Sequence, residues 1–176
     1  MAKTELSKLE WLAKAEAYCA RAEHCAADVR RKFYEWGLQD AEIKDFSPED
    51  GLDIFDFIEQ NLYADNFLND RRFCEAYVHD KVAYQSWGRL KIQAGLRALQ
   101  LPESEIRSAL ENIDETAYFD NLRKLIRARK TDSEDKRLRF LLQRGFTYED
   151  IKNMCFLLHI PKKSSTFAVA KVWTDI

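Results

Sequence analysis

The sequence predicts an all-α protein made of three tandem three-helix repeats. Apolar residues recur at intervals of three and four along segments of roughly 10–17 residues, and no segment alternates strictly, which favours helices over strands. Five glycines and three prolines are too few for a β sandwich full of tight turns. With 46% hydrophobic and 33% charged residues, the chain has the composition of a folded protein. We therefore expect eight or nine helices.

Capping residues predict where several of these helices begin. Ser47-Pro48-Glu49-Asp50 combines a side chain that accepts a backbone N–H, a proline suited to the first helical position and acids that favour the positive end of the helix dipole. Similar starts are Pro102 with Glu103 and Glu105, Ser133-Glu134-Asp135, and Thr147-x-x-Asp150. A further helix is expected from about Glu115 to Arg129.

An internal repeat links these helices. Three windows align, beginning at Cys25, Gly88 and Ser133, and each has an apolar residue 8, 13 and 18 positions after its start. In window order these residues are Phe33, Leu38 and Ile43; Leu96, Leu101 and Ile106; and Leu141, Phe146 and Ile151. Identical spacings in all three windows predict the same helix–turn–helix three times.

The turn within each window is explained by helix capping. Gly37 and Gly145 precede the apolar residue at position 13, where a helix can end through a left-handed residue that glycine adopts without a Cβ clash. In such a cap the next residue packs back onto the helix, so we expect Leu38 to contact Phe33. The middle window has Gln100 in place of glycine, so its cap is expected to be strained by about 1 kcal/mol or to be shaped differently.

The repeat predicts the domain organisation. The three repeats are expected at residues 1–62, 63–113 and 114–160, with a C-terminal extension at 161–176 to which we assign no role. Residues 44–56 are predicted to be an acidic insertion in the first repeat, which would displace its third helix.

Charge is distributed unevenly although the formal net charge is only −2. Residues 40–70 hold ten acids and one base, whereas residues 121–144 hold nine bases and three acids. The acidic stretch is either an ordinary solvated face, or a patch that faces basic loops of a partner or shields the chain from DNA. Solvated surface charge is also the simplest reading of each single base. As a group, the following bases are predicted to form one positive surface that contacts a partner: Arg71, Lys81, Arg89, Lys91, Arg97, Arg123, Arg127 and Arg129.

Residues 66–96 mix apolar, aromatic and basic side chains. Phe73, Tyr77, Ile92 and Leu96 have the spacing of core residues. The other residues of note are Asn69 or Asp70 as a helix cap, Arg72 as the partner of a carboxylate, and Tyr84 and Trp87, which either stack on nucleic-acid bases or are buried. For Tyr84 and Trp87 we favour burial.

Motifs for enzymatic or metal chemistry are not recognisable. The sequence has no P-loop and no G-x-G-x-x-G, and its three histidines lie in no nucleophile or metal motif. His24 and Cys25 with Cys19 fall short of the four ligands of a closed zinc site. The four cysteines form no C-x-x-C pair, and neither a signal peptide nor about 18 consecutive apolar residues is present. We expect a cytoplasmic protein with reduced thiols, no cofactor, no metal and no enzymatic activity.

The pattern as a whole resembles the RecX family of bacterial regulatory proteins over about residues 12–158. The matching residues are Phe67-Leu68-Asn69-Asp70-x-Arg72-Phe73, Ala76-Tyr77-Val78, Trp87-Gly88-x-x-Lys91-Ile92, Leu96, Ile106-x-x-Ala109-Leu110 and Leu141-x-x-Arg144-Gly145-Phe146-x-x-x-x-Ile151. The resemblance is distributed along the chain, and the acidic insertion and the missing glycine at Gln100 depart from it.

The resemblance implies an elongated, curved helical solenoid that binds the RecA recombinase and its filaments on DNA, and we expect a monomer with at most weak, electrostatic binding to single- and double-stranded DNA. It would block filament extension or promote disassembly, and so suppress recombinase, ATPase and coprotease activities. Repeats that contact only their neighbours also make long surfaces with few deep pockets. The alternative is a helical repeat protein that binds single- and double-stranded DNA electrostatically, without sequence specificity and without a filament partner.

Overall fold

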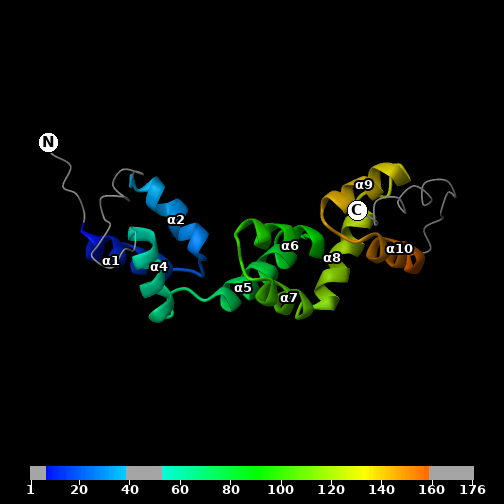
Figure 1. Ribbon diagram of the computed structural model, residues 1–176. Coiled ribbons are helices and arrows are strands. Elements are labelled where there is room, and N and C mark those ends of the chain that lie inside the picture. The colour runs from blue at the N-terminus through cyan, green and yellow to red at the C-terminus, as the bar shows by residue number, and fades with distance from the viewer. Residues whose placement is uncertain (1–6, 39–52, 159–176) are drawn as a thin grey trace. The chain divides into compact units, whose positions relative to one another are not determined.

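The computed structural model describes residues 7–38 and 53–158, and these residues contain nine helices and no strand (Figure 1). In chain order the helices are α1 (Lys8–Cys19), α2 (Ala26–Glu35), α4 (Ile54–Ala64), α5 (Asp70–Ala83), α6 (Arg89–Ala98), α7 (Glu103–Glu111), α8 (Glu115–Ala128), α9 (Glu134–Gln143) and α10 (Tyr148–Leu157). The predicted all-α class is confirmed. None of these helices combines the length and the apolar character needed to span a membrane.

The predicted helix starts agree with the structure wherever it describes them. The Ser133 hydroxyl accepts a hydrogen bond from the backbone N–H of Lys136 at the start of α9. Thr147 and Asp150 each accept a hydrogen bond from the other's backbone N–H, at 3.0 and 3.2 Å, and so form a capping box at the start of α10. Pro102 directly precedes α7. The start expected at residues 47–50 lies outside the described residues.

Three further expectations concern the start of α5. Asn69 is the capping residue, because its side-chain oxygen accepts the backbone N–H of Arg72 at 3.0 Å. Arg72 pairs with the carboxylate of Glu23 at 3.0 Å, as expected of an arginine among apolar residues. Phe73 is buried, as are Ile92 and Leu96 in α6, whereas Tyr77 is only half-buried.

The glycine caps are confirmed. Gly37 has φ 93°, its N–H donates to the carbonyl of Tyr34 at 3.0 Å, and the N–H of Leu38 donates to the carbonyl of Phe33 at 3.1 Å. These two bonds define a Schellman motif, which satisfies carbonyls that the end of a helix leaves free. Gly145 ends α9 with φ 86° and the same pair of bonds. The apolar residues at window positions 8 and 13 are buried in all three windows, whereas Ile43 lies outside the described residues.

The middle cap keeps the left-handed conformation without a glycine. Gln100 has φ 61°, a region in which an L residue is disfavoured by about 1–2 kcal/mol. We expect Gln100→Gly to raise the free energy of unfolding by about 1 kcal/mol, measured by urea denaturation. The matched control is Gln60→Gly, which replaces an exposed glutamine inside α4 and should lower the same quantity by about 0.5–1 kcal/mol. If Gln100→Gly lowered the free energy of unfolding as Gln60→Gly should, the cap at Gln100 would not be strained.

The chain divides into two compact units. Unit 1 comprises Met1–Ala76 and Leu99–Glu105, and unit 2 comprises Tyr77–Ala98 and Ile106–Ile176. The core of unit 1 lies among α1, α2 and α4, where Trp11 meets Phe33 edge to face with 5.2 Å between ring centroids. In unit 2, α10 packs on α8 and α9, and its core includes Tyr118 and Phe146 (Figure 1).

The predicted repeat boundaries stay a prediction. Of the expected acidic insertion at 44–56, the described part begins at Asp53, whose side chain caps α4 by accepting the N–H of Asp56 at 2.9 Å. The rest of that insertion and the C-terminal extension at 161–176 lie outside the described residues.

Candidate functional site

The start of α6 is joined to the end of α9 by direct backbone contact. The N–H of Gly88 donates to the carbonyl of Arg144 at 2.8 Å, and the N–H of Leu90 donates to the carbonyl of Gly145 at 3.0 Å. A Cβ atom at Gly88 would lie 2.2 Å from backbone atoms of Gly145 and Phe146. Only a glycine allows the two backbone segments to come this close. Their contact fixes the position of the turn between α5 and α6 within unit 2.

Two side chains hold the end of α5 from other helices. The Asn121 amide of α8 donates to the carbonyl of Val82 at 2.8 Å. The Arg144 guanidinium at the end of α9 donates to the carbonyl of Gln85 at 2.7 Å. Within the turn, Ser86 adopts a φ of 50°. The turn is therefore fastened to α8 and α9 by hydrogen bonds to its own backbone.

A buried polar network joins α6, α8 and α10. The Tyr118 side chain is fully buried, and its hydroxyl donates to the Asp150 carboxylate at 3.0 Å. The Arg89 guanidinium lies 4.2 Å from the Tyr118 ring centroid and pairs with Glu115 and, at 3.9 Å, with Asp150. Burial raises the pKa of Tyr118, and the charge of Asp150 raises it further, so the hydroxyl keeps its proton. Arg89 is thus a half-buried, ion-paired side chain.

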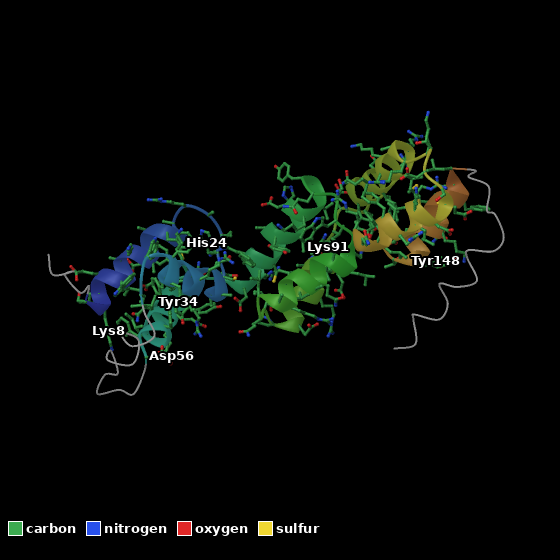
Figure 2. All side chains as sticks on the ribbon, turned by 90° about the horizontal axis from the view of Figure 1, so that it is seen from above. Lys8, His24, Tyr34, Asp56, Lys91 and Tyr148 are labelled. Carbon is green, nitrogen blue, oxygen red and sulfur yellow. The ribbon has the colours of Figure 1, made fainter. Side chains whose placement is uncertain are left out.

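Next to this network lies a cationic and aromatic group that we name the turn cluster, which consists of Lys81, Trp87, Lys91 and Arg144. The ammonium groups of Lys81 and Lys91 lie 5.0 and 4.4 Å from the ring centroid of Trp87. Neither lysine forms an ion pair with any described residue, and Arg144 forms none either. Figure 2 labels Lys91 on α6.

Tyr84 corrects an expectation from the sequence. Its side chain is 79% exposed, although the spacing of apolar residues favoured burial. Tyr84 directly follows the last residue of α5, and its N–H still donates to the carbonyl of Asp80 at 3.0 Å. Among the described aromatic residues its ring meets that of His79, edge-on at 6.2 Å. Trp87 is half-buried.

The eight predicted contact bases do not share one environment. Arg71 lies in unit 1, and the other seven lie in unit 2. Arg71, Arg123 and Arg129 pair with Glu75, Asp120 and Asp132 at 3.0, 2.8 and 2.8 Å. Arg97 and Arg127 are exposed at the ends of α6 and α8.

The structure therefore brings together Lys81 and Lys91, and it places Arg144 at the same turn, although Arg144 was not among the predicted contact bases. The contact of Arg144 with Gln85 joins residues 59 positions apart, which no local pattern reveals. Tyr84 lies directly after the last residue of α5 and is exposed, which the spacing of apolar residues did not indicate.

Metal ligands do not gather in the described residues, where no group of three or more His, Cys, Asp or Glu side chains is placed to hold an ion. The four cysteines are buried, and burial raises the pKa of Cys19 to about 11 and that of Cys25 to about 12. These two thiols therefore stay protonated near neutral pH and are poor nucleophiles or metal ligands.

Comparison with known proteins gives one consistent result. A family model described as the second three-helix domain of RecX matches residues 69–110, which span α5, α6 and most of α7. The regulatory protein RecX of Herminiimonas arsenicoxydans is 30% identical over 155 residues, covering 84% of this chain and 93% of that protein. The regulatory protein RecX of Clostridium botulinum (strain Alaska E43 / Type E3) is 28% identical over 159 residues, covering 84% of this chain and 72% of that protein.

Solved structures agree on the fold. The crystal structure of RecX from Lactobacillus salivarius superposes with a TM-score of 0.64 at 18% identity, covering 88% of this chain and 97% of that one. A second crystal structure, of a regulatory protein RecX, gives a TM-score of 0.61 at 19% identity, covering 88% of this chain and 81% of that one.

Proposed function

The chain belongs to the RecX family of regulatory proteins, which modulate the RecA recombinase, and from this premise we propose that it binds RecA and RecA–DNA filaments and lowers their recombinase, ATPase and coprotease activities. It is a regulatory protein and not an enzyme. The observation that carries the proposal is the match of 155 residues at 30% identity, because it covers 93% of a curated relative and not one domain alone. A cytoplasmic location and a monomeric state are part of the proposal.

We further propose that the bases of unit 2 provide the main contact with the filament. A nucleoprotein filament carries phosphates and acidic protein surfaces, and a positive surface both speeds encounter with such a partner and selects for it. Lys81 and Lys91 support this proposal because their charges are not neutralised by described carboxylates. Arg89 contributes less as a direct contact, since Glu115 and Asp150 already hold it.

The direct test is RecA ATPase activity on single-stranded DNA, titrated with this protein. We expect ATP hydrolysis to fall at ratios well below one molecule per RecA, because a regulator that blocks extension or promotes disassembly acts on many subunits at once. An effect that appears only when the protein is in excess over DNA would contradict a filament regulator and favour simple competition for DNA.

Salt dependence separates the proposal from the alternative of a DNA-binding protein without a filament partner. A protein that acts by occupying DNA loses affinity for DNA steeply as the salt concentration rises. On a plot of the logarithm of the binding constant against the logarithm of the salt concentration, each phosphate contact with a single strand adds about 0.7 to the downward slope. The turn cluster gives the alternative some support, since it gathers cations at the half-buried Trp87 ring. A filament regulator should inhibit RecA at concentrations at which it barely retains DNA on its own.

Charge reversal on α8 tests the predicted contact bases. Arg123→Glu with Arg127→Glu should raise the concentration needed for half-inhibition of RecA severalfold, because both side chains lie on the surface and their reversal repels an anionic partner. The matched control is Arg21→Glu with Arg107→Glu, two exposed arginines outside the predicted set. Unchanged circular dichroism is required of both variants. Equal inhibition by both would remove α8 from the contact and make the acidic stretch at 40–70 the better candidate.

A further inference from the structure

We propose that Arg89 is a binding site for a carboxylate of a partner protein, and that the side chain of Glu115 occupies this site in the free chain. The inference rests on the proposed function, because it names the acidic group by which a RecA filament is recognised and the residue that restrains this contact. A partner carboxylate replaces Glu115 at the guanidinium, so Glu115 lowers the affinity of the free chain for its partner.

The Arg89 guanidinium is held by groups that are themselves fixed. It lies 4.2 Å from the ring centroid of Tyr118, whose side chain is fully buried. The Asp150 carboxylate lies 3.9 Å from the guanidinium, and it accepts hydrogen bonds from the Tyr118 hydroxyl and from the backbone N–H of Thr147. A guanidinium that is ordered in advance loses little conformational entropy when a ligand binds. Its planar fork of N–H donors matches the two oxygens of a carboxylate.

Glu115 differs from these fixed groups because it lies at the surface. Its side chain is 59% exposed, whereas that of Asp150 is 14% exposed. Within the described part of the chain, the Glu115 side chain pairs with Arg89 and with no other residue. An ion pair with one exposed partner contributes little to stability, because water solvates the carboxylate when the pair separates. A carboxylate from another protein can therefore take this position at a small cost.

The start of α8 does not depend on the ion pair between Glu115 and Arg89. The Asp114 side chain caps the helix, since it accepts the backbone N–H groups of Thr116 and Ala117 at 2.9 and 3.1 Å. A released Glu115 stays in the first turn of α8, where the positive end of the helix dipole favours a carboxylate. The exchange of one carboxylate for another therefore leaves α8 intact.

The present occupant indicates the chemistry of the ligand. The group that pairs with Arg89 in the free chain is a carboxylate, and a partner carboxylate replaces it one for one, with the same charge and the same planar shape. The arrangement of the guanidinium with Asp150 and Tyr118 is then kept. A phosphate is tetrahedral and does not reproduce this shape. We therefore expect an aspartate or glutamate side chain of a partner to be preferred over a nucleic-acid phosphate.

Nuclear magnetic resonance of the full chain locates the contact. The side-chain Nε–H signal of Arg89, assigned by its absence from Arg89→Lys, should shift in a saturable manner on titration with acetyl-Gly-Glu-Gly-amide. The same peptide with glutamine in place of glutamate should leave the signal unchanged. Dimethyl phosphate, which carries the same single charge as the glutamate peptide, should bind more weakly. The site is overturned if the signal ignores the glutamate peptide or responds to dimethyl phosphate at lower concentrations.

Removal of the Glu115 charge should strengthen the contact. Glu115→Gln should lower the Kd for the glutamate peptide by about two- to fivefold, as expected when an exposed ion pair no longer competes with the ligand. The concentration needed for half-inhibition of RecA ATPase activity should fall by a similar factor. The matched control is Glu111→Gln, which removes one exposed carboxylate at the last residue of α7 and leaves the Arg89 ion pair in place. Equal effects of the two variants would mean that net charge alone matters, and the role of Glu115 would be refuted.

Arg89→Lys tests whether the fork of the guanidinium is needed. The lysine keeps a positive charge beside Asp150 but lacks the two parallel N–H donors. We expect this substitution to raise the concentration for half-inhibition of RecA severalfold. In the Arg89→Lys background, Glu115→Gln should have no more effect than Glu111→Gln. An undiminished effect of Glu115→Gln there would show that Glu115 acts on another cation. Unchanged circular dichroism is required of every variant.

The outcomes distinguish this site from the proposed function. If the glutamate peptide binds at Arg89 and Glu115→Gln tightens that binding, but the chain does not inhibit RecA, the site stands and the proposed function falls. If the chain inhibits RecA but the Arg89 signal ignores the glutamate peptide, the proposed function stands and the site falls. Because Glu115 is exposed, an unchanged unfolding midpoint is expected for Glu115→Gln.

Discussion

Gly88→Ala is expected to lower the free energy of unfolding by about 3 kcal/mol. The new methyl group would lie 2.2 Å from the backbone of Gly145 and Phe146, and a backbone neighbour cannot move aside as a side-chain tip can. Overpacking of this kind costs about 1–3 kcal/mol, and separating the two segments also weakens two backbone hydrogen bonds at about 0.5–1.5 kcal/mol each. Urea denaturation followed by far-ultraviolet circular dichroism measures the loss.

Gly95→Ala is the matched control for this prediction. Gly95 lies inside α6, where alanine favours the helix by about 1 kcal/mol, and its added Cβ would meet only the hydroxyl end of the Tyr77 side chain at 2.3 Å. The gain in helix propensity and the cost of displacing the Tyr77 hydroxyl oppose each other. The net loss in the free energy of unfolding should therefore be well below that of Gly88→Ala. Similar losses for the two variants would show that the α6–α9 contact is looser than its hydrogen bonds indicate.

Gly145→Val should also lower the free energy of unfolding by about 3 kcal/mol. Two effects add here. The φ of 86° disfavours an L residue by about 1–2 kcal/mol, and more for a β-branched one, and the new Cβ would lie 2.4 Å from the backbone nitrogen of Lys91. The unfolding midpoint in urea is again the measurement.

Gly145→Asn separates the two effects. Asparagine tolerates the left-handed conformation but still carries a Cβ, so the loss should be smaller than for valine and should reflect mainly the contact with Lys91. A silent valine variant would mean that α9 does not end at this glycine.

Local features of this fold could be predicted from the sequence. The caps at Ser133, Thr147 and Gly145 depend on hydrogen bonds between residues three to five positions apart, so a short window contains all the information. Gln100 marks the limit of this reasoning. The sequence allowed either a strained cap or a different one, and the chain keeps the left-handed turn despite the cost.

The candidate site could be predicted only in part, for a physical reason. Lys81 and Lys91 belonged to the predicted contact bases, but their convergence depends on the turn in which Trp87 lies. That turn is held by Asn121 and Arg144, which are 39 and 59 residues from their acceptors. Helical periodicity reports the spacing of apolar residues and not which neighbours the fold brings to them, so Tyr84 was expected to be buried although its side chain is exposed.

Asp150 has a consequence for cooperativity. One carboxylate completes the capping box of α10 and accepts the hydroxyl hydrogen of Tyr118 from α8, while Arg89 of α6 approaches the same group. Fraying of the first turn of α10 would therefore leave a buried hydroxyl without its acceptor and weaken the anchoring of a neighbouring guanidinium. Because the opening of any one of the three helices would break contacts of the other two, we expect local opening of unit 2 at this point to be concerted.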